Sequence, residues 1–233
     1  MSTVALELVG APSALADRAA GLVADHLRGA VAERGTATVA FSGGNTPAAM
    51  LSALTAHDLP WRHIHVFQVD ERVVANSHLE RNLGMLRSRL LAHVPVPASH
   101  VHPMPVADAD LEAAASRYAA VLARVCGEPA VLDLVHLGLG GDGHTASLVP
   151  GDPVLAVGDR DVAPTGLYQG TRRLTLTYPA INRARHRLWL VSGRDKAEAL
   201  GRLTRADPAI PAAGVSQDDT TVLTDVNPAG SGG

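Results

Sequence analysis

Residues 131–147 read VLDLVHLGLGGDGHTAS, a short apolar run that passes directly into a glycine-rich polar loop. The run has the length and the branched apolar composition of a buried strand, and the loop begins where that strand would end. In parallel α/β sheets, ligands bind outside the carboxyl ends of the strands. This stretch therefore predicts such a sheet and indicates where its site should lie.

The rest of the chain alternates short apolar runs with long periodic segments. The runs predict strands at Val4–Val9, Thr36–Phe41, Ile64–Val69, Val131–Leu137, Leu188–Val191 and Thr221–Leu223. The periodic segments predict helices at Ser13–Arg34, Pro47–Thr55, Leu79–His93, Asp110–Cys126 and Asp195–Thr204. This alternation favours an α/β fold with a largely parallel sheet flanked by helices. Because no linker-like stretch divides the chain, we expect one domain over 1–227 and a flexible C-terminal tail over 228–233.

Composition excludes several classes of protein. The 233 residues carry a net charge of -3 and a single cysteine, Cys126, so neither a broad nucleic-acid surface nor an intramolecular disulfide is expected. The N-terminus lacks a signal-peptide pattern, and no stretch reaches the roughly 18 apolar residues of a membrane span. We expect a cytoplasmic monomer or small homo-oligomer with no membrane or nucleic-acid partner.

The glycine-rich loop after residue 137 carries the richest set of polar groups. Gly138 to Gly143 matches G-x-G-x-x-G, but Asp142 would bring a carboxylate against a pyrophosphate, and Pro150 and Pro153 prevent the helix that a dinucleotide site needs. The loop is better suited to present Asp142 and His144. A histidine transfers protons near neutral pH, and a carboxylate beside it can fix its tautomer.

Two other predicted strands are also followed directly by residues suited to binding a ligand. Ser42-Gly43-Gly44-Asn45-Thr46-Pro47 predicts an open helix N-terminus, with Thr46 as a possible cap, and such an end attracts phosphate or carboxylate. A plain strand-to-helix turn is the alternative. Asp70-Glu71-Arg72 follows the strand Ile64–Val69 and is either a solvated turn or part of a site.

Positive charge is distributed unevenly between arginine and lysine. Of the 20 basic residues, 19 are arginine and one, Lys196, is lysine. Lys196 falls in the first turn of the predicted helix Asp195–Thr204, directly after a strand, so we expect its compact ammonium group to face a ligand. The segment Arg172-Arg173-Leu174-Thr175-Leu176-Thr177 offers a second source of cations.

Metal binding and serine hydrolysis have weaker support in the sequence. His63 with His65, and His100 with His102, are i, i+2 pairs that would share a strand face, but no third ligand is spaced to complete a site. A G-x-S-x-G nucleophile elbow is absent.

Six motifs occur in order across roughly residues 38–200, and together they resemble those of the 6-phosphogluconolactonases. They are SGGNTP, VDER, RNLGMLRSRLL, LGLGGDGHTASLVPG, RRLTLTYPAIN and LVSGRDKAEAL. The resemblance implies a sugar-phosphate-isomerase-like (Rossmann-like) fold. It also implies hydrolysis of the δ-lactone of 6-phosphogluconate in the oxidative pentose phosphate pathway, without a metal or other cofactor. Departures from the usual family pattern occur at Asn45, Arg81, Gly141, Val149 and Asp225, the last without the usual tryptophan, and none removes a chemically active group.

The roles of the site residues are expectations of the same kind. His144 is the expected general base and acid, and Asp142 orients it or accepts sugar hydroxyls. The resemblance implies that Arg72 faces the lactone carbonyl, with Asp70 as a further partner. We expect the phosphate on the segment Ser42, Gly43, Gly44 and Thr46, with Arg173 and Lys196 as counter-charges.

Two alternatives stay open. A related deaminase would continue after the DGH block into an acidic residue, whereas this chain has Ser147-Leu148-Val149-Pro150. A sugar-phosphate sensor would keep the anion site without needing a proton-transfer histidine.

Overall fold

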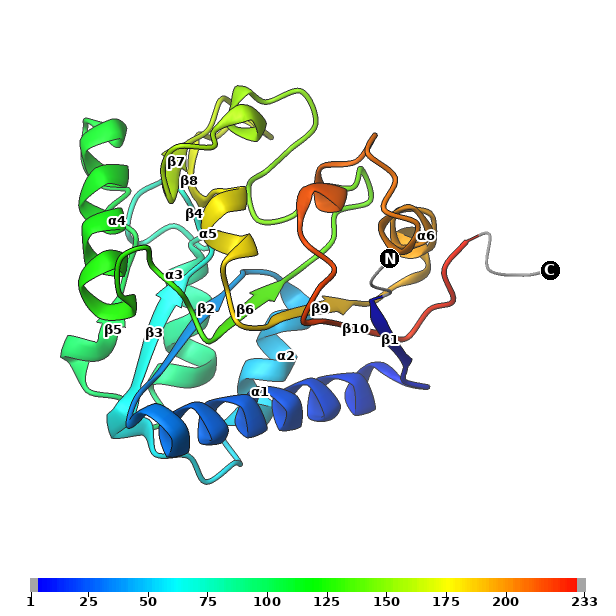
Figure 1. Cartoon of the computed structure of the whole chain (residues 1–233), viewed down its shortest axis with the longest axis horizontal. Coiled ribbons are helices and arrows are strands. Elements are labelled where there is room, and N and C mark those ends of the chain that lie inside the picture. The colour runs from blue at the N-terminus through cyan, green and yellow to red at the C-terminus, as the bar shows by residue number, and fades with distance from the viewer. Residues whose placement is uncertain (1–3, 230–233) are drawn as a thin grey trace.

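A seven-stranded sheet runs through the centre of the molecule in the computed structural model, which describes residues 4–229 (Figure 1). All of its neighbouring strands pair in parallel. In spatial order the strands are β1 (Ala5–Leu8), β10 (Thr220–Thr224), β9 (Arg187–Val191), β6 (Leu134–Leu137), β2 (Ala37–Phe41), β3 (Ile64–Gln68) and β5 (Val101–His102). The carboxyl ends of β9, β6, β2 and β3 therefore lie side by side along one edge.

Helices cover both faces of the sheet and enclose a separate apolar core on each. One face packs on α1 (Pro12–Arg34), α2 (Asn45–Leu54) and α3 (Asn82–Leu86), through residues such as Leu27, Met50 and Leu86. The other face packs on α4 (Leu111–Cys126), α5 (Tyr178–Asn182) and α6 (Ala197–Thr204), where Tyr118 and Leu200 are buried. The predicted α/β architecture is confirmed.

Local sequence explains where the two longest helices begin and end. Pro12 stands at the first turn of α1, where its missing N–H costs nothing, and Gly35 ends the helix with φ of 76°. The Asp110 carboxylate caps α4 by accepting the N–H of Ala113 at 3.0 Å. Apolar residues in both helices recur at helical spacing, so each buries a single face against the sheet.

A second, three-stranded antiparallel sheet was not predicted. It contains β4 (Asp70–Arg72), β8 (Arg173–Leu176) and β7 (Val162–Pro164), in the order β4-β8-β7. Arg72 lies directly opposite Arg173 in the β4–β8 pair. The solvated-turn interpretation of residues 70–72 is wrong, because β4 is a strand in which Asp70 and Glu71 are buried.

The predicted elements of the main sheet are present, with small shifts at their ends. The six predicted strands correspond to β1, β2, β3, β6, β9 and β10 within three residues at each end. The helix expected over 79–93 begins only at Asn82 and becomes a π-helical turn at Arg87–Leu91. The helix expected from Asp195 begins at Ala197, after a 3₁₀ turn over Arg194–Lys196.

The C-terminal segment contacts α6 where the structure describes it. The Ala229 N–H donates to the Ala197 carbonyl at 2.8 Å, and the Ala229 carbonyl accepts from Arg205 at 3.0 Å. Residues 230–233 of the predicted flexible tail lie outside the described residues, and the domain boundary at 227 stays a prediction. Between residues 4 and 229, no helix combines the length and the apolarity needed to cross a membrane.

Candidate active site

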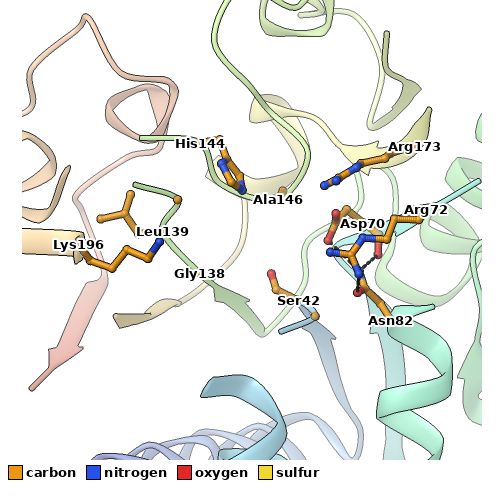
Figure 2. Close-up of a pocket in the computed structure, with 12 residues that line it drawn as sticks. Ser42, Asp70, Arg72, Asn82, Gly138, Leu139, His144, Ala146, Arg173 and Lys196 are labelled. Carbon is orange, nitrogen blue, oxygen red and sulfur yellow. Dashed lines mark hydrogen bonds between the residues drawn. The ribbon is translucent and has the colours of Figure 1, made fainter. Parts of the chain in front are cut away.

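A cavity of about 230 Å³ opens above the carboxyl ends of β2, β3, β6 and β9. Its walls come from the loops after these strands, from α3 and from the antiparallel sheet (Figure 2). The lining residues are Ser42, Gly43, Asp70, Arg72, Asn82, Gly138, Leu139, Gly140, His144, Ala146, Arg173 and Lys196. Seven of the ten predicted site residues belong to this set: Ser42, Gly43, Asp70, Arg72, His144, Arg173 and Lys196.

His144 and Asp142 form a hydrogen-bonded pair beside the cavity. The imidazole Nδ1 lies 2.6 Å from Asp142 Oδ1, which also accepts the His144 backbone N–H at 3.1 Å. Burial alone would raise the pKa of Asp142, but the hydrogen bonds from His144 and from the Tyr168 hydroxyl outweigh it and lower that pKa. An ionised carboxylate only accepts hydrogen bonds, so Nδ1 carries the proton and Nε2 keeps a free lone pair.

The glycine at position 140 is needed for this pair to form. A Cβ atom at Gly140 would lie 2.0 Å from His144 Nδ1 and 2.5 Å from Asp142 Oδ1, so a side chain there would displace both groups. The Gly140 N–H also donates to the His144 carbonyl at 2.8 Å and closes the loop. The loop thus places the imidazole by close backbone approach.

Asp70 is a buried carboxyl group in the wall of the cavity. Its Oδ2 accepts the Ser147 hydroxyl at 2.6 Å, and its Oδ1 lies 3.3 Å from Asn82 Nδ2. Burial raises the pKa of Asp70, and the Ser147 hydrogen bond and the Arg173 charge only partly oppose that rise. A buried carboxyl with a raised pKa in a cavity is typical of a functional site.

Arg72 reaches the same wall and is held near it by α3. Its guanidinium donates to the Glu80 carbonyl at 2.6 Å and lies 3.4 Å from Asn82 Oδ1. The Asn82 amide donates in turn to the Asp70 carbonyl at 2.9 Å. Asn82 therefore connects the cation and the carboxyl group of this wall.

Arg173 is a buried cation with unused donor capacity. Its side chain comes from β8, is 5% exposed, and has an Nε with no hydrogen-bond partner among residues 4–229. A buried, unpaired donor costs free energy, and an anionic ligand in the cavity would remove that cost. Arg173 is thus the strongest single sign of an anion site.

Lys196 lies on the other side of the cavity. Figure 2 shows its side chain across from Arg72 and Arg173, with His144 and Ser42 between them. Its Nζ pairs with the exposed Asp195 carboxylate at 2.9 Å, an ion pair that a ligand can replace at small cost. Lys196 therefore lines the cavity, and its contact with a ligand stays a prediction.

Three predicted site residues do not line the cavity. Asp142 is hydrogen-bonded to His144 but does not line the cavity itself, and Gly44 and Thr46 belong to the start of α2. Gly44 is the N-cap residue, with φ of 120°, and no side chain caps the helix, so the expectation that Thr46 caps it is wrong. Gly43 is the part of this segment that reaches the cavity.

Sequence reasoning missed Asn82, Ser147 and Tyr168. Asn82 and Ser147 sit inside motifs that carry the family resemblance, but nothing in their spacing shows that both contact Asp70. Tyr168 had one usable signal, because the chain contains only three tyrosines. A rare aromatic residue near a predicted site can be weighed in the same way as the single lysine.

Three of the four histidines considered for metal binding, His65, His100 and His102, form a stacked group at the β3 and β5 edge. His65 Nδ1 lies 3.0 Å from His102 Nε2, and the His100 ring stacks on His65 at 3.9 Å. His63 is exposed in a neighbouring turn. In the described part of the chain, no three side chains of the metal-binding types converge on one point.

Comparison with known proteins gives consistent matches over most of the chain. Residues 10–224 match the family model described as glucosamine-6-phosphate isomerases/6-phosphogluconolactonase. A 6-phosphogluconolactonase from Synechocystis is 46% identical over 200 residues, covering 83% of each chain. The crystal structure of a 6-phosphogluconolactonase from Thermotoga maritima has a TM-score of 0.85 at 26% identity, covering 94% of this chain and 98% of that one. A monomeric glucosamine-6-phosphate deaminase shares the fold, with a TM-score of 0.82 at 21% identity over 94% of this chain and 96% of its own.

Proposed function

Because the chain belongs to the family of glucosamine-6-phosphate isomerases and 6-phosphogluconolactonases, we propose that it is a lactonase of the oxidative pentose phosphate pathway. It hydrolyses 6-phospho-D-glucono-1,5-lactone to 6-phosphogluconate and is thus a carboxylic ester hydrolase. The observation that carries this proposal is the His144 and Asp142 pair beside a cavity walled by Arg72, Arg173 and Lys196. These groups match a substrate with an ester at one end and a phosphate at the other.

His144 is the general base and then the general acid. Its Nε2 takes a proton from water as the water oxygen attacks the lactone carbonyl. When the tetrahedral intermediate collapses, the bond from carbon to the ring oxygen breaks, and the imidazolium returns the proton to that oxygen. The product is a carboxylic acid that ionises at neutral pH. Asp142 stabilises the imidazolium through the 2.6 Å contact.

Arg72 supplies the positive charge that the intermediate needs. Attack on the carbonyl places a negative charge on its oxygen, and a preorganised cation there lowers the barrier. The contacts of Arg72 with Glu80 and Asn82 support this role because they limit its motion. Asp70, with its raised pKa and its hydrogen bond from Ser147, is suited to contact a sugar hydroxyl.

The phosphate binds at the segment that follows β2. Gly43 offers a backbone N–H, and the start of α2 at Gly44 and Thr46 adds a favourable dipole, whereas Ser42 lines the cavity with its hydroxyl donating to the His136 carbonyl at 2.9 Å. Arg173 and Lys196 approach from opposite sides as counter-charges. Anchoring the phosphate fixes the distance between His144 and the lactone carbonyl.

A coupled assay tests the reaction. Glucose-6-phosphate dehydrogenase generates the lactone, whose disappearance is followed against the spontaneous rate, with and without a chelator. We expect rapid loss of the lactone in both conditions, because His144 and Arg72 supply the base and the positive charge. Loss of activity with chelator would refute metal-independent hydrolysis, and a rate equal to the spontaneous one would refute the lactonase function.

Two variants separate chemistry from binding. His144→Ala should lose about 10²-fold or more in turnover while it keeps its affinity for 6-phosphogluconate. Lys196→Ala should instead raise KM strongly and change kcat little, because it removes a counter-charge remote from the carbonyl. A fully active His144→Ala variant would exclude the proposed base, and an unchanged KM would remove Lys196 from the phosphate site.

The same assays address the alternatives. Ammonia release from glucosamine 6-phosphate would indicate a deaminase. The sequence argues against that activity, because this chain has Ser147 where a deaminase would continue into an acidic segment. The Ser147 hydroxyl donates instead to Asp70. Tight binding of the phosphosugar without turnover would indicate a sensor.

We further propose a cytoplasmic monomer or small homo-oligomer that acts without nucleic acid or membrane. The small net charge of -3 and the single cysteine support this proposal. Size-exclusion chromatography with light scattering measures the oligomeric state.

A further inference from the structure

We propose that Tyr168 is a positioning residue for the reaction: its hydroxyl holds the Asp142 carboxylate in the orientation that keeps His144 Nε2 available as a base. Tyr168 lies outside the cavity lining and comes from the connection between β7 and β8. The inference rests on the proposed lactonase function and adds a residue to it.

The contacts divide the two oxygens of Asp142 between two partners. The Tyr168 hydroxyl donates to Oδ2 at 2.9 Å, while Oδ1 accepts from His144 Nδ1 at 2.6 Å. The hydroxyl oxygen also lies 3.4 Å from His144 Nδ1, and the two rings meet edge to face with centroids 5.4 Å apart. Each carboxylate oxygen is thereby committed, so the carboxylate cannot rotate without breaking a hydrogen bond.

The charge states fit this arrangement. Burial and the Asp142 carboxylate both raise the pKa of Tyr168, so the hydroxyl keeps its proton and remains a donor at neutral pH. Donation to Oδ2 leaves Oδ1 as the acceptor for Nδ1–H, which selects the tautomer with a free Nε2. Loss of the hydroxyl would leave Oδ2 without this donor and let the carboxylate turn away from the imidazole.

The ring of Tyr168 has a second contact that is separable from the hydroxyl. The Arg173 guanidinium carbon lies over the ring, 5.1 Å from its centroid, within the range of a cation–π interaction. The hydroxyl thus serves the His144 pair, and the ring supports the cation that we assign to the phosphate.

The backbone fixes Tyr168 at a tight hairpin turn. Tyr168 and Thr171 exchange two backbone hydrogen bonds of 3.0 and 3.2 Å around Gln169 and Gly170. These two central residues have φ of 50° and 82°, the signature of a type I′ turn. Leu167, the other large apolar side chain at this tip, is 76% exposed. The hairpin therefore exposes the Leu167 side chain to solvent and directs the Tyr168 side chain toward Asp142 and His144. If hydrophobic packing alone decided the orientation, the leucine would be the residue to be buried.

Tyr168→Phe and Tyr168→Leu test the two contacts by steady-state kinetics. Tyr168→Phe removes only the hydroxyl, so we expect kcat to fall about tenfold with KM changed less than twofold. Tyr168→Leu also removes the ring, so KM for the lactone should rise as well. Leu167→Ala, an equal disturbance of the same hairpin, should leave both constants at the wild-type values. Wild-type kcat in Tyr168→Phe would overturn the inference while leaving the lactonase function intact.

A double-mutant cycle tests whether Tyr168 acts through Asp142. In an Asp142→Ala background there is no carboxylate to hold, so adding Tyr168→Phe should lower kcat no further. An independent tenfold loss in that background would assign Tyr168 another role and refute the inference.

Imidazole ¹⁵N NMR gives a readout that does not depend on turnover. At a pH where His144 is neutral, the wild-type protein should show Nδ1 protonated and Nε2 free, with the His144 signals identified by their absence from His144→Ala. In Tyr168→Phe, a population protonated at Nε2 should appear. An unchanged spectrum would contradict the inference, even if the wild-type protein lacked lactonase activity.

Discussion

Gly43 shows how a single residue of the site is constrained by its neighbours. A Cβ atom at this position would lie 1.8 Å from Asn82 Oδ1 and 2.3 Å from its Cγ, far inside van der Waals contact. Asn82 cannot move freely, because its amide donates to the Asp70 carbonyl and its oxygen lies near Arg72. The backbone at Gly43 must therefore remain bare for this wall of the cavity to form.

Gly43→Ala should reduce activity while the protein stays folded. The added methyl group pushes Asn82 away from Asp70 and Arg72, so we expect kcat/KM to fall by about 10- to 100-fold, the cost of about 1.4–2.7 kcal/mol of misplaced contacts. Circular dichroism and the coupled assay measure the two effects. Gly84→Ala is the control, since its Cβ would meet nothing closer than Arg81 Cβ at 3.9 Å. Equal activity of the two variants would contradict this explanation.

At the residue scale, the sequence was most informative where a functional group follows a strand directly. Ser42, Asp70, His144 and Lys196 all lie within seven residues after the end of a strand of the main sheet, and all line the cavity. Asn82 and Tyr168 were not predictable in this way. They reach the site from α3 and from a hairpin tip, and only tertiary structure brings those elements to the carboxyl edge of the sheet.

Among the elements, α3 depends on a residue from another part of the chain. The buried Glu71 carboxylate accepts the backbone N–H groups of Asn82 and Leu83, both at 2.9 Å, at the start of this helix. It also accepts from Gln68 at 2.8 Å and pairs with the Arg81 guanidinium at 3.2 Å. Glu71 thus caps α3, neutralises a buried arginine and anchors β4 at once.

Glu71→Ala should destabilise the fold by about 3–5 kcal/mol, because it leaves the buried Arg81 unpaired and the first N–H groups of α3 unsatisfied. Urea denaturation followed by circular dichroism measures the loss in free energy of unfolding. Glu33→Ala, at an exposed position of α1, should change that free energy by less than about 0.5 kcal/mol. A similar small effect of both variants would show that the Glu71 cluster contributes little.

The sequence pattern located the central strands but missed β4 and placed the start of α3 too early. The central strands are short apolar runs, and burial on both faces requires that composition. The strand β4 is Asp-Glu-Arg, and the side chains of Asp70 and Glu71 can be buried because Asn82, Ser147 and Arg81 satisfy them. The apolar spacing that predicted a helix from Leu79 was misleading, since Leu79 is 99% exposed and the distant Glu71 sets the start of α3.

Across the whole molecule, several histidines are wholly or partly buried, which favours their neutral form. Burial lowers the pKa of His136 to about 3 and, with neighbouring histidines contributing, lowers those of His102 and His186 to about 4. The pKa values of His26 and His65 are lowered for the same reason. The unfolded chain therefore binds more protons than the folded one in mildly acidic solution.

The free energy of unfolding should fall as the pH drops from about 6.5 toward 4. The sign follows from the lowered pKa values: the stability is fully present above the unfolded value and is lost as the unfolded histidines take up protons. His136→Leu removes one such group, so the slope in this range should decrease by about 1.4 kcal/mol per pH unit. Urea titrations at several pH values measure the slope. A slope in His136→Leu equal to that of the wild-type protein would refute this account.

The overall architecture could be predicted from the sequence because strand and helix alternate so regularly. Three features could not be predicted, because each depends on contacts between distant segments: the order of the strands, the antiparallel sheet and the position of the hairpin at Tyr168. The site combines both kinds of information: its loops follow the predicted strands, and its far wall comes from β4, β8 and α3.

The register of the antiparallel sheet has one more consequence. Arg72 and Arg173 are opposite each other in the β4–β8 register, and burial together with the charge of Arg72 lowers the pKa of Arg173, as expected for like charges in such positions. In the proposed binding mode the phosphate lies at Arg173 and the reacting carbonyl at Arg72, so the negative charge of the ligand reduces that repulsion. Binding of an anionic ligand should therefore stabilise the fold. Inorganic phosphate should raise the melting temperature of the protein, and the increase should be larger at low than at high ionic strength.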